Sequence, residues 1–196
     1  LDVKQDGGDL IVTANYKLGN LDKAQWTINP SGDLALDYTY NFSGVVDLMG
    51  IRFDYPEDQV ISKRWLGAGP YRVWQNRIHG TQYDIWENDY NDPIPGETFT
   101  YPEFKGYFGS VSWMSIRTKE GTISLTNETP DFYIGVYQPR DGRDRLLYTL
   151  PESGISVLNV IPPVRNKVNS TDLCGPSSQP KWVDGPQTGR LVLRFE

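Results

Sequence analysis

The sequence predicts an all-β protein, an antiparallel two-sheet sandwich of the supersandwich type. Aromatic residues, which favour strands, make up 13% of the chain and include 6 Trp and 12 Tyr. The 19 Gly and 14 Pro are typical of many short strands joined by tight turns. No stretch shows the apolar period of an amphipathic helix of ten residues or more. At 196 residues the chain is long enough for one well-buried core, and we expect a single domain over residues 1–196.

The first sixty residues predict four antiparallel strands. Residues 10–16 and 24–28 are strand-like and can pair across a turn at Gly19 and Asn20. Residues 34–40 alternate large apolar side chains with small or polar ones, which indicates a half-buried strand. Residues 50–55 alternate again and end at a proline.

The remainder of the chain predicts further short strands separated by two long loops. Apolar or alternating runs indicate strands at residues 60–66, 111–117, 122–126, 132–137, 155–161 and 191–195. The loops are expected at residues 71–97 and 166–182, where Asn, Asp, Gly and Pro interrupt every apolar period. Long loops in a compact domain tend to carry function or to contact another domain.

One stretch, residues 63–77, attracts attention because a strand there runs into Gly67, Gly69 and Pro70 and then into an aromatic loop. We expect strand pairing to stop at the glycines, which would leave rings and guanidinium groups at the end of a sheet. Trp74, Trp86 and Arg77 are therefore candidates for stacking on and binding a carbohydrate. The alternative is that these rings plug the sandwich edge or pack on a neighbouring domain.

Charge and cysteine content exclude several classes of function. The formal net charge of -6 argues against a nucleic-acid partner, which needs a basic surface. The single cysteine, Cys174, excludes an intrachain disulfide and a cysteine-based zinc site, and no cofactor or metal is expected. No run of eighteen apolar residues is present, so we expect no membrane span.

Catalytic residues are not evident in this chain. Glycoside hydrolysis requires two carboxyl groups across the scissile bond, but the spacing of the 25 acidic residues singles out no pair. The sole histidine, His79, cannot form a two-histidine site, and no nucleophile motif accompanies it. We expect the isolated domain not to be an enzyme.

Two segments carry a family resemblance. The run Trp65-Leu66-Gly67-Ala68-Gly69-Pro70, followed by Asn76-Arg77, resembles the Trp-x-Gly-x-Gly-Pro…Asp-Arg segment in the C-terminal domain of family 2 β-galactosidases. Residues 102–113 resemble that family's Pro-Gln-Glu-Asn-Gly-x-Arg-x-x-Val-x-Trp, with its proline, glycine, valine and tryptophan in register. Phe104, Lys105 and Phe108 depart from that pattern. The family's domain is longer and begins with additional strands, so the resemblance implies a shortened version with an exposed sheet edge.

The resemblance also marks a loop. In those enzymes a loop near the end of this domain reaches the active site of a catalytic barrel and offers a tryptophan followed by Ser-Pro. Alignment on Pro176 makes Asp172, Leu173 and Cys174 the candidates for that substrate-rim loop, with Cys174 in the place of the tryptophan. Both catalytic glutamates of the family lie on the barrel, so the resemblance transfers no catalytic residue to this chain.

The resemblance implies the non-catalytic C-terminal domain of a bacterial family 2 glycoside hydrolase. Its partners would be the catalytic domain of the same longer polypeptide and a carbohydrate. The alternative is an independent carbohydrate-binding module that uses Trp74 and Trp86. A weaker alternative is a mutarotase-like sugar enzyme, which the lone His79 disfavours because mutarotases use two histidines. A periplasmic or extracellular location is expected, and the sequence leaves a cytoplasmic one open.

Overall fold

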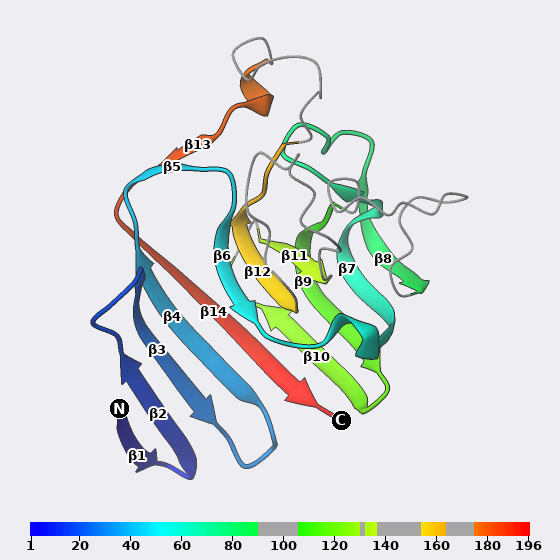
Figure 1. Ribbon diagram of the computed structural model, residues 1–196. Coiled ribbons are helices and arrows are strands. Elements are labelled where there is room, and N and C mark those ends of the chain that lie inside the picture. Colours follow the sequence, from blue (N-terminus) through cyan, green and yellow to red (C-terminus); the bar gives the residue numbers. More distant parts are fainter. Residues whose placement is uncertain (90–105, 130–131, 137–153, 164–174) are drawn as a thin grey trace.

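The structure is a computed structural model that describes residues 1–89, 106–129, 132–136, 154–163 and 175–196 (Figure 1). Fourteen strands are assigned to these residues. They are β1 (Asp2–Asp6), β2 (Asp9–Asn15), β3 (Leu21–Ile28), β4 (Leu34–Asn41), β5 (Gly44–Val46), β6 (Met49–Phe53), β7 (Val60–Val73), β8 (Gln82–Asp89), β9 (Tyr107–Thr118), β10 (Gly121–Asn127), β11 (Tyr133–Val136), β12 (Ile155–Val160), β13 (Lys181–Val183) and β14 (Pro186–Phe195). Two short 3-10 helices, η1 (Glu57–Gln59) and η4 (Pro176–Ser178), complete the description.

The strands form two layers that share β9. The large layer has the order β1-β2-β3-β4-β14-β10-β9-β7-β8, and the small layer has the order β11-β12-β6. The layers connect where Phe108 of β9 pairs with Ile134 of β11. Figure 1 shows the small layer lying across one face of the large one, with the β5–β13 ribbon at one end. Every pairing among the described strands is antiparallel, so the all-β, antiparallel prediction is confirmed.

The hydrophobic core lies between the two layers. Alternating residues of β4, β9, β10 and β14 contact the inner side chains of β11 and β12, as expected for strands with one buried face. The core residues that are least exposed include Trp65, Met114, Ile116, Leu125, Ile134, Val157 and Leu191. Of the three tryptophans placed in strands by the sequence, Trp65 is fully buried, whereas Trp26 and Trp113 are half-buried.

One sequence expectation is wrong at β7. The strand does not end at Gly67 but runs through Gly69 to Val73, and its pairing with β8 extends to the Gly69–Gln82 pair. Shifts in the β7–β9 register, between Leu66 and Ala68 and again after Ala68, take up the irregularity that the glycines indicate.

The expectation of an irregular segment over residues 71–97 is also wrong in part, because its middle forms β8. Strand β8 pairs only with β7 among the described strands, and most of its side chains are exposed. An edge strand of this kind needs no apolar alternation, so the sequence carries little signal for it. Strands β1, β5 and β13 were not predicted for the same reason, since each is short or largely exposed.

Candidate functional site

The candidate site is the end of the sandwich where β7 stops. Beyond Val73 the chain makes a tight turn in which the amide of Arg77 donates to the carbonyl of Trp74 at 2.8 Å. The amide of Trp74 donates back to the carbonyl of Arg77 at 3.3 Å. This turn presents Gln75 and Asn76 at its tip, beside the exposed Arg77.

The two side chains at the tip hold a segment that is about a hundred residues further along the chain. Gln75 Nε2 donates to the carbonyls of Ser177, at 3.0 Å, and Gln179, at 2.8 Å. Asn76 Nδ2 donates to the Oγ of Ser178 at 2.8 Å, and Ser178 is itself buried. We call this set of bonds from Gln75 and Asn76 to residues 177–179 the amide clamp. It joins the two segments that the sequence marked as long loops, a contact that no local pattern predicts.

The segment that the clamp holds, residues 177–179, lies shortly after the rim-loop candidates in the sequence. Asp172, Leu173 and Cys174 lie outside the described residues, and the description resumes at Gly175. The η4 turn that the clamp holds therefore begins two residues after Cys174. Any segment that leaves η4 toward Cys174 starts from an anchored point.

The glycines of the first family motif have a structural role. Gly69 lies under the ring of Trp86, and a Cβ at this position would be 2.5 Å from Trp86 Cδ1. Trp86 Nε1 donates to the carbonyl of Gly67 at 3.1 Å, which fixes the ring. A Cβ on Gly67 would lie 2.8 Å from the carbonyl oxygen of Gly109. Both positions thus permit a close approach between β7, β8 and β9.

The two tryptophans proposed as sugar platforms are not exposed rings. Trp74 is 5% exposed and packs edge-on against Tyr107, with ring centroids 5.5 Å apart. Trp86 is half-buried on Gly69. Trp74 is therefore unavailable for stacking in this structure, because it packs in a small core cluster with Val73, Tyr107, Leu158 and Ile161. Arg77 is exposed, as its candidate role requires.

Phe108 explains one departure from the family pattern. This residue occupies the position of the family's arginine, is 1% exposed, and packs edge-on against Trp65 with centroids 4.7 Å apart. The Nζ of Lys63 lies 5.7 Å from the same ring, and this lysine is also buried. Phe108 is thus a core residue in this structure.

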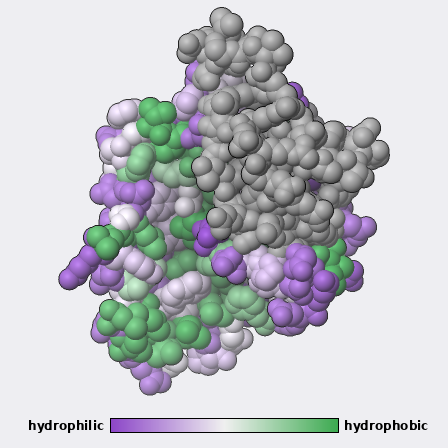
Figure 2. Space-filling view, in the orientation of Figure 1, coloured by the Kyte–Doolittle hydropathy of each residue, from purple (hydrophilic) through white to green (hydrophobic). Residues whose placement is uncertain are grey.

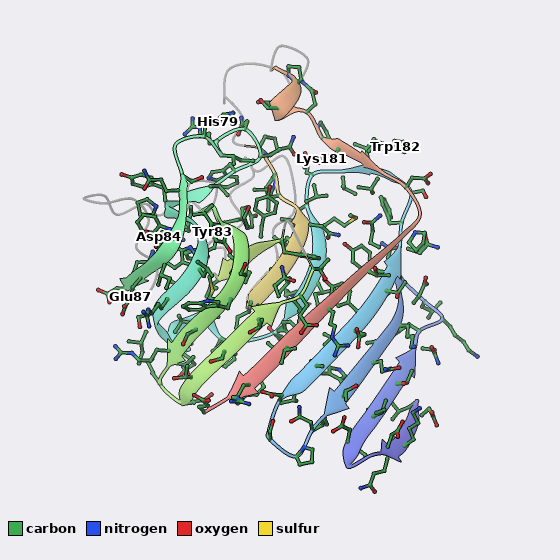
Figure 3. All side chains as sticks on the ribbon, turned by 180° about the vertical axis from the view of Figure 1, so that it is seen from behind. His79, Tyr83, Asp84, Glu87, Lys181 and Trp182 are labelled. Atoms are coloured by element: carbon green, nitrogen blue, oxygen red, sulfur yellow. The ribbon has the colours of Figure 1, made fainter. Side chains whose placement is uncertain are left out.

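Other exposed aromatic rings lie elsewhere, and sequence analysis did not single them out. Trp182 on β13 is 70% exposed, Tyr83 on β8 is 59% exposed and Tyr71 on β7 is 54% exposed. Figure 3 shows Tyr83 and Trp182 on opposite sides of the view, with His79 near the end of the sandwich. Tyr83 and Trp182 therefore do not form one platform.

The described residues contain no buried carboxylate, and their buried polar side chains are Lys63, Thr118, Ser156 and Ser178. Within the same part of the chain no cluster of three His, Cys, Asp or Glu residues could hold a metal ion. His79 is exposed. None of the described helical segments is long and apolar enough to cross a membrane.

A cleft of about 360 Å³ lies beside β6, and Tyr40 forms part of its wall. The hydroxyl of Tyr40 is hydrogen-bonded to Asn159 Oδ1, and its ring stacks on Tyr38 at an angle of 7°. The Tyr38 hydroxyl is buried and finds no partner among the described residues. Burial raises the pKa of Tyr40 to about 12 and raises that of Tyr38 further.

These two tyrosines give a matched prediction. We expect Tyr40→Phe to lower the free energy of unfolding by about 1–2 kcal/mol, because a partly buried hydrogen bond to Asn159 is lost. Tyr38→Phe should leave that free energy unchanged or raise it by up to about 1 kcal/mol, since it removes an unpartnered hydroxyl. Urea unfolding of both variants at pH 7 checks the difference.

The pH dependence of the free energy of unfolding provides a control for these two tyrosine variants. A pKa raised in the folded state means that the stabilisation is present below the ordinary tyrosine pKa near 10 and is lost as pH rises through 10 to 12. The alkaline loss of stability should be smaller in each variant than in the parent chain. Equal losses in all three proteins would contradict the assignment.

The similarity of this chain to known proteins is low. No model of a known protein family and no curated protein matches the sequence. Among solved structures, the crystal structure described as the GalM/aldose epimerase homologue from C. elegans is similar over all of this chain and 68% of that chain, with 10% identity and a TM-score of 0.41.

Proposed function

We propose that this chain is a non-catalytic β-sandwich domain of a family 2, β-galactosidase-like glycoside hydrolase. In this role it packs on the catalytic barrel of the same polypeptide and contributes the loop with Asp172, Leu173 and Cys174 to the rim of the substrate site. The proposed contribution is positioning of the sugar and exclusion of water, and both catalytic carboxylates come from the barrel.

The amide clamp is the observation that supports this proposal best. It connects the turn that carries the first family motif to the segment directly after the rim-loop candidates. An anchored base is what a loop needs if it is to place a side chain at a substrate with little loss of conformational entropy. The packing of Gly67, Gly69 and Trp86 supports the same reading, because it accounts for the glycines of the motif.

The alternative, an independent carbohydrate-binding module, loses support because Trp74, one of its two proposed stacking rings, is buried. A mutarotase-like enzyme would need a second histidine beside His79, and no other histidine exists in the sequence. We therefore favour the accessory role over both alternatives. A carbohydrate partner is proposed only through the rim loop, with Arg77 as the exposed cation nearest to the clamp in the sequence.

A direct test examines the isolated chain. It should neither hydrolyse aryl β-galactosides nor bind galactose or lactose saturably at millimolar concentration by calorimetry. Saturable binding that Arg77→Ala or Trp86→Ala abolishes would overturn the accessory role in favour of the binding module. The reading frame that encodes the chain should also encode a barrel domain with two catalytic glutamates, and a frame without one would contradict the proposal.

The clamp itself predicts a kinetic effect in that longer enzyme. We expect the double variant Gln75→Ala/Asn76→Ala to raise KM by about tenfold, with a smaller effect on kcat, because the rim loop loses its anchored base. Steady-state kinetics with an aryl galactoside measure this change. The matched control is Gln25→Ala, an amide on the polar face of β3 whose side chain contacts Thr13. Equal KM values for the two variants would contradict the role of the clamp.

A further inference from the structure

The exposure of one row of side chains across the large layer increases from the centre to the edge. Strand register places Leu36, Trp26, Val12 and Val3 side by side on β4, β3, β2 and β1. Leu36 is 4% exposed, Trp26 and Val12 are half-buried, and Val3 is 55% exposed. The same apolar face therefore changes from core to surface over three strands.

The opposite face of these strands is polar. The adjacent row consists of Asp37, Gln25, Thr13 and Asp2, and Thr13 Oγ1 contacts Gln25 Oε1 at 3.4 Å. Strands with one polar and one apolar face are those that a second layer normally covers. Figure 2 shows hydrophobic surface gathered on the side of the molecule where β1, β2 and β3 lie.

The small layer ends directly above this face. Its last strand, β6, pairs only with β12 among the described strands. The ring of Phe53 on β6 meets that of Trp26 at 6.3 Å between centroids, so β6 lies over β3 and the layer stops there. Beyond it the large layer continues through β2 and β1, over which no described strand of the small layer lies (Figure 1).

The cleft of about 360 Å³ runs along the edge of β6 that no described strand pairs with. Gly50, Ile51 and Arg52 of β6 line one wall, and Leu21 and Tyr40 of β3 and β4 line the other. An unpaired strand edge presents backbone amides and carbonyls that need partners, and β6 contains no proline that would block addition of another strand. The cleft thus combines an apolar lining with a strand edge that has no partner among the described strands.

We propose that this edge is a docking site for an extended polypeptide strand that adds to β6 and extends the small layer over β3 and β2. The occupant has apolar side chains at alternate positions facing Trp26 and Val12 and polar ones facing solvent. One added strand shifts the boundary of the layer by about 4.8 Å, which is the width of one strand of the large layer beneath. The new contact continues the existing interface between the layers, with Phe53 and Trp26 at its boundary. This inference is independent of the proposed function.

The test uses the 196-residue chain and a synthetic strand as the probe. The probe is a peptide of about eight residues in which valine and threonine alternate between terminal lysines. The control peptide has proline in place of the two central valines and cannot form the ladder. We expect the first peptide to slow amide hydrogen exchange in β6 by at least about tenfold, saturably below about 1 mM, and the second to leave it unchanged. No protection, or equal protection by both peptides, would overturn the proposal.

Two variants of β2 separate docking from a change in folding. Val12 faces the apolar side and Ile11 the opposite side of the same strand, and both are half-buried. Val12→Lys should abolish the protection that the peptide causes, whereas Ile11→Lys should retain it. Sedimentation of the chain without peptide tests whether a second copy of the chain occupies the site. A monomer agrees with the proposal, and a dimer whose β6 amides are already protected would overturn it in favour of a second copy as the occupant.

Discussion

Trp65→Ala is expected to lower the free energy of unfolding by about 3–5 kcal/mol, the range for truncation of a buried tryptophan. The side chain is 1% exposed, packs edge-on against Phe108 and donates from Nε1 to the carbonyl of Ala68 at 3.3 Å. Its loss leaves a cavity in the core and removes the hydrogen bond to Ala68. Since domains of this size are stable by about 5–15 kcal/mol, the variant should approach the limit of folding. Urea unfolding followed by circular dichroism measures the change.

The control for this prediction is the same substitution at an exposed tryptophan. Trp182 is 70% exposed on β13, so Trp182→Ala should change the free energy of unfolding by no more than about 0.5 kcal/mol. A similar loss in the two variants would show that Trp65 is not the centre of the core. If Trp65→Ala does not fold, the milder Trp65→Phe should still lower stability more than Trp182→Ala does.

Gly69→Ala is expected to lower the free energy of unfolding by about 2 kcal/mol, within the range for overpacking. The new Cβ would be 2.5–2.7 Å from three atoms of the Trp86 ring. That ring cannot simply move away, because its Nε1 is bonded to the carbonyl of Gly67 and its edge contacts the core. Strand β8, which pairs only with β7 among the described strands, should therefore loosen. Hydrogen exchange in β8 reports this directly.

A double-mutant cycle isolates the clash. In the background of Trp86→Ala, the cost of Gly69→Ala should fall to near zero, because the ring that it strikes is gone. Gly175→Ala is the matched control, since its φ is -63° and nothing lies within 4 Å of the added Cβ. A cost for Gly69→Ala that persists without Trp86 would place the strain in the backbone instead.

The loop expected at residues 71–97 shows which strand pairing the sequence did not predict. From the sequence, we expected strand pairing to stop at Gly67 and Gly69 and Trp86 to lie in the loop that follows. In the fold they allow pairing to continue, because the ring of one strand fills the space that the glycine of its neighbour leaves. Trp74 shows the same limit, since its burial depends on Tyr107 and Gly106, which lie more than thirty residues away in the sequence.

The sequence by itself determined the all-β class, the turns and the strands whose side chains alternate, such as β2, β4 and β10. These are local properties, set by backbone preferences and by one buried face per strand. Only the tertiary structure decided the edge strands β1 and β8, the burial of Trp74 and the amide clamp. An edge strand needs no apolar pattern, and the clamp joins residues 102 positions apart through side-chain amides. Polar contacts of this kind leave no periodic signal in a sequence, because their partners are brought together by the fold alone.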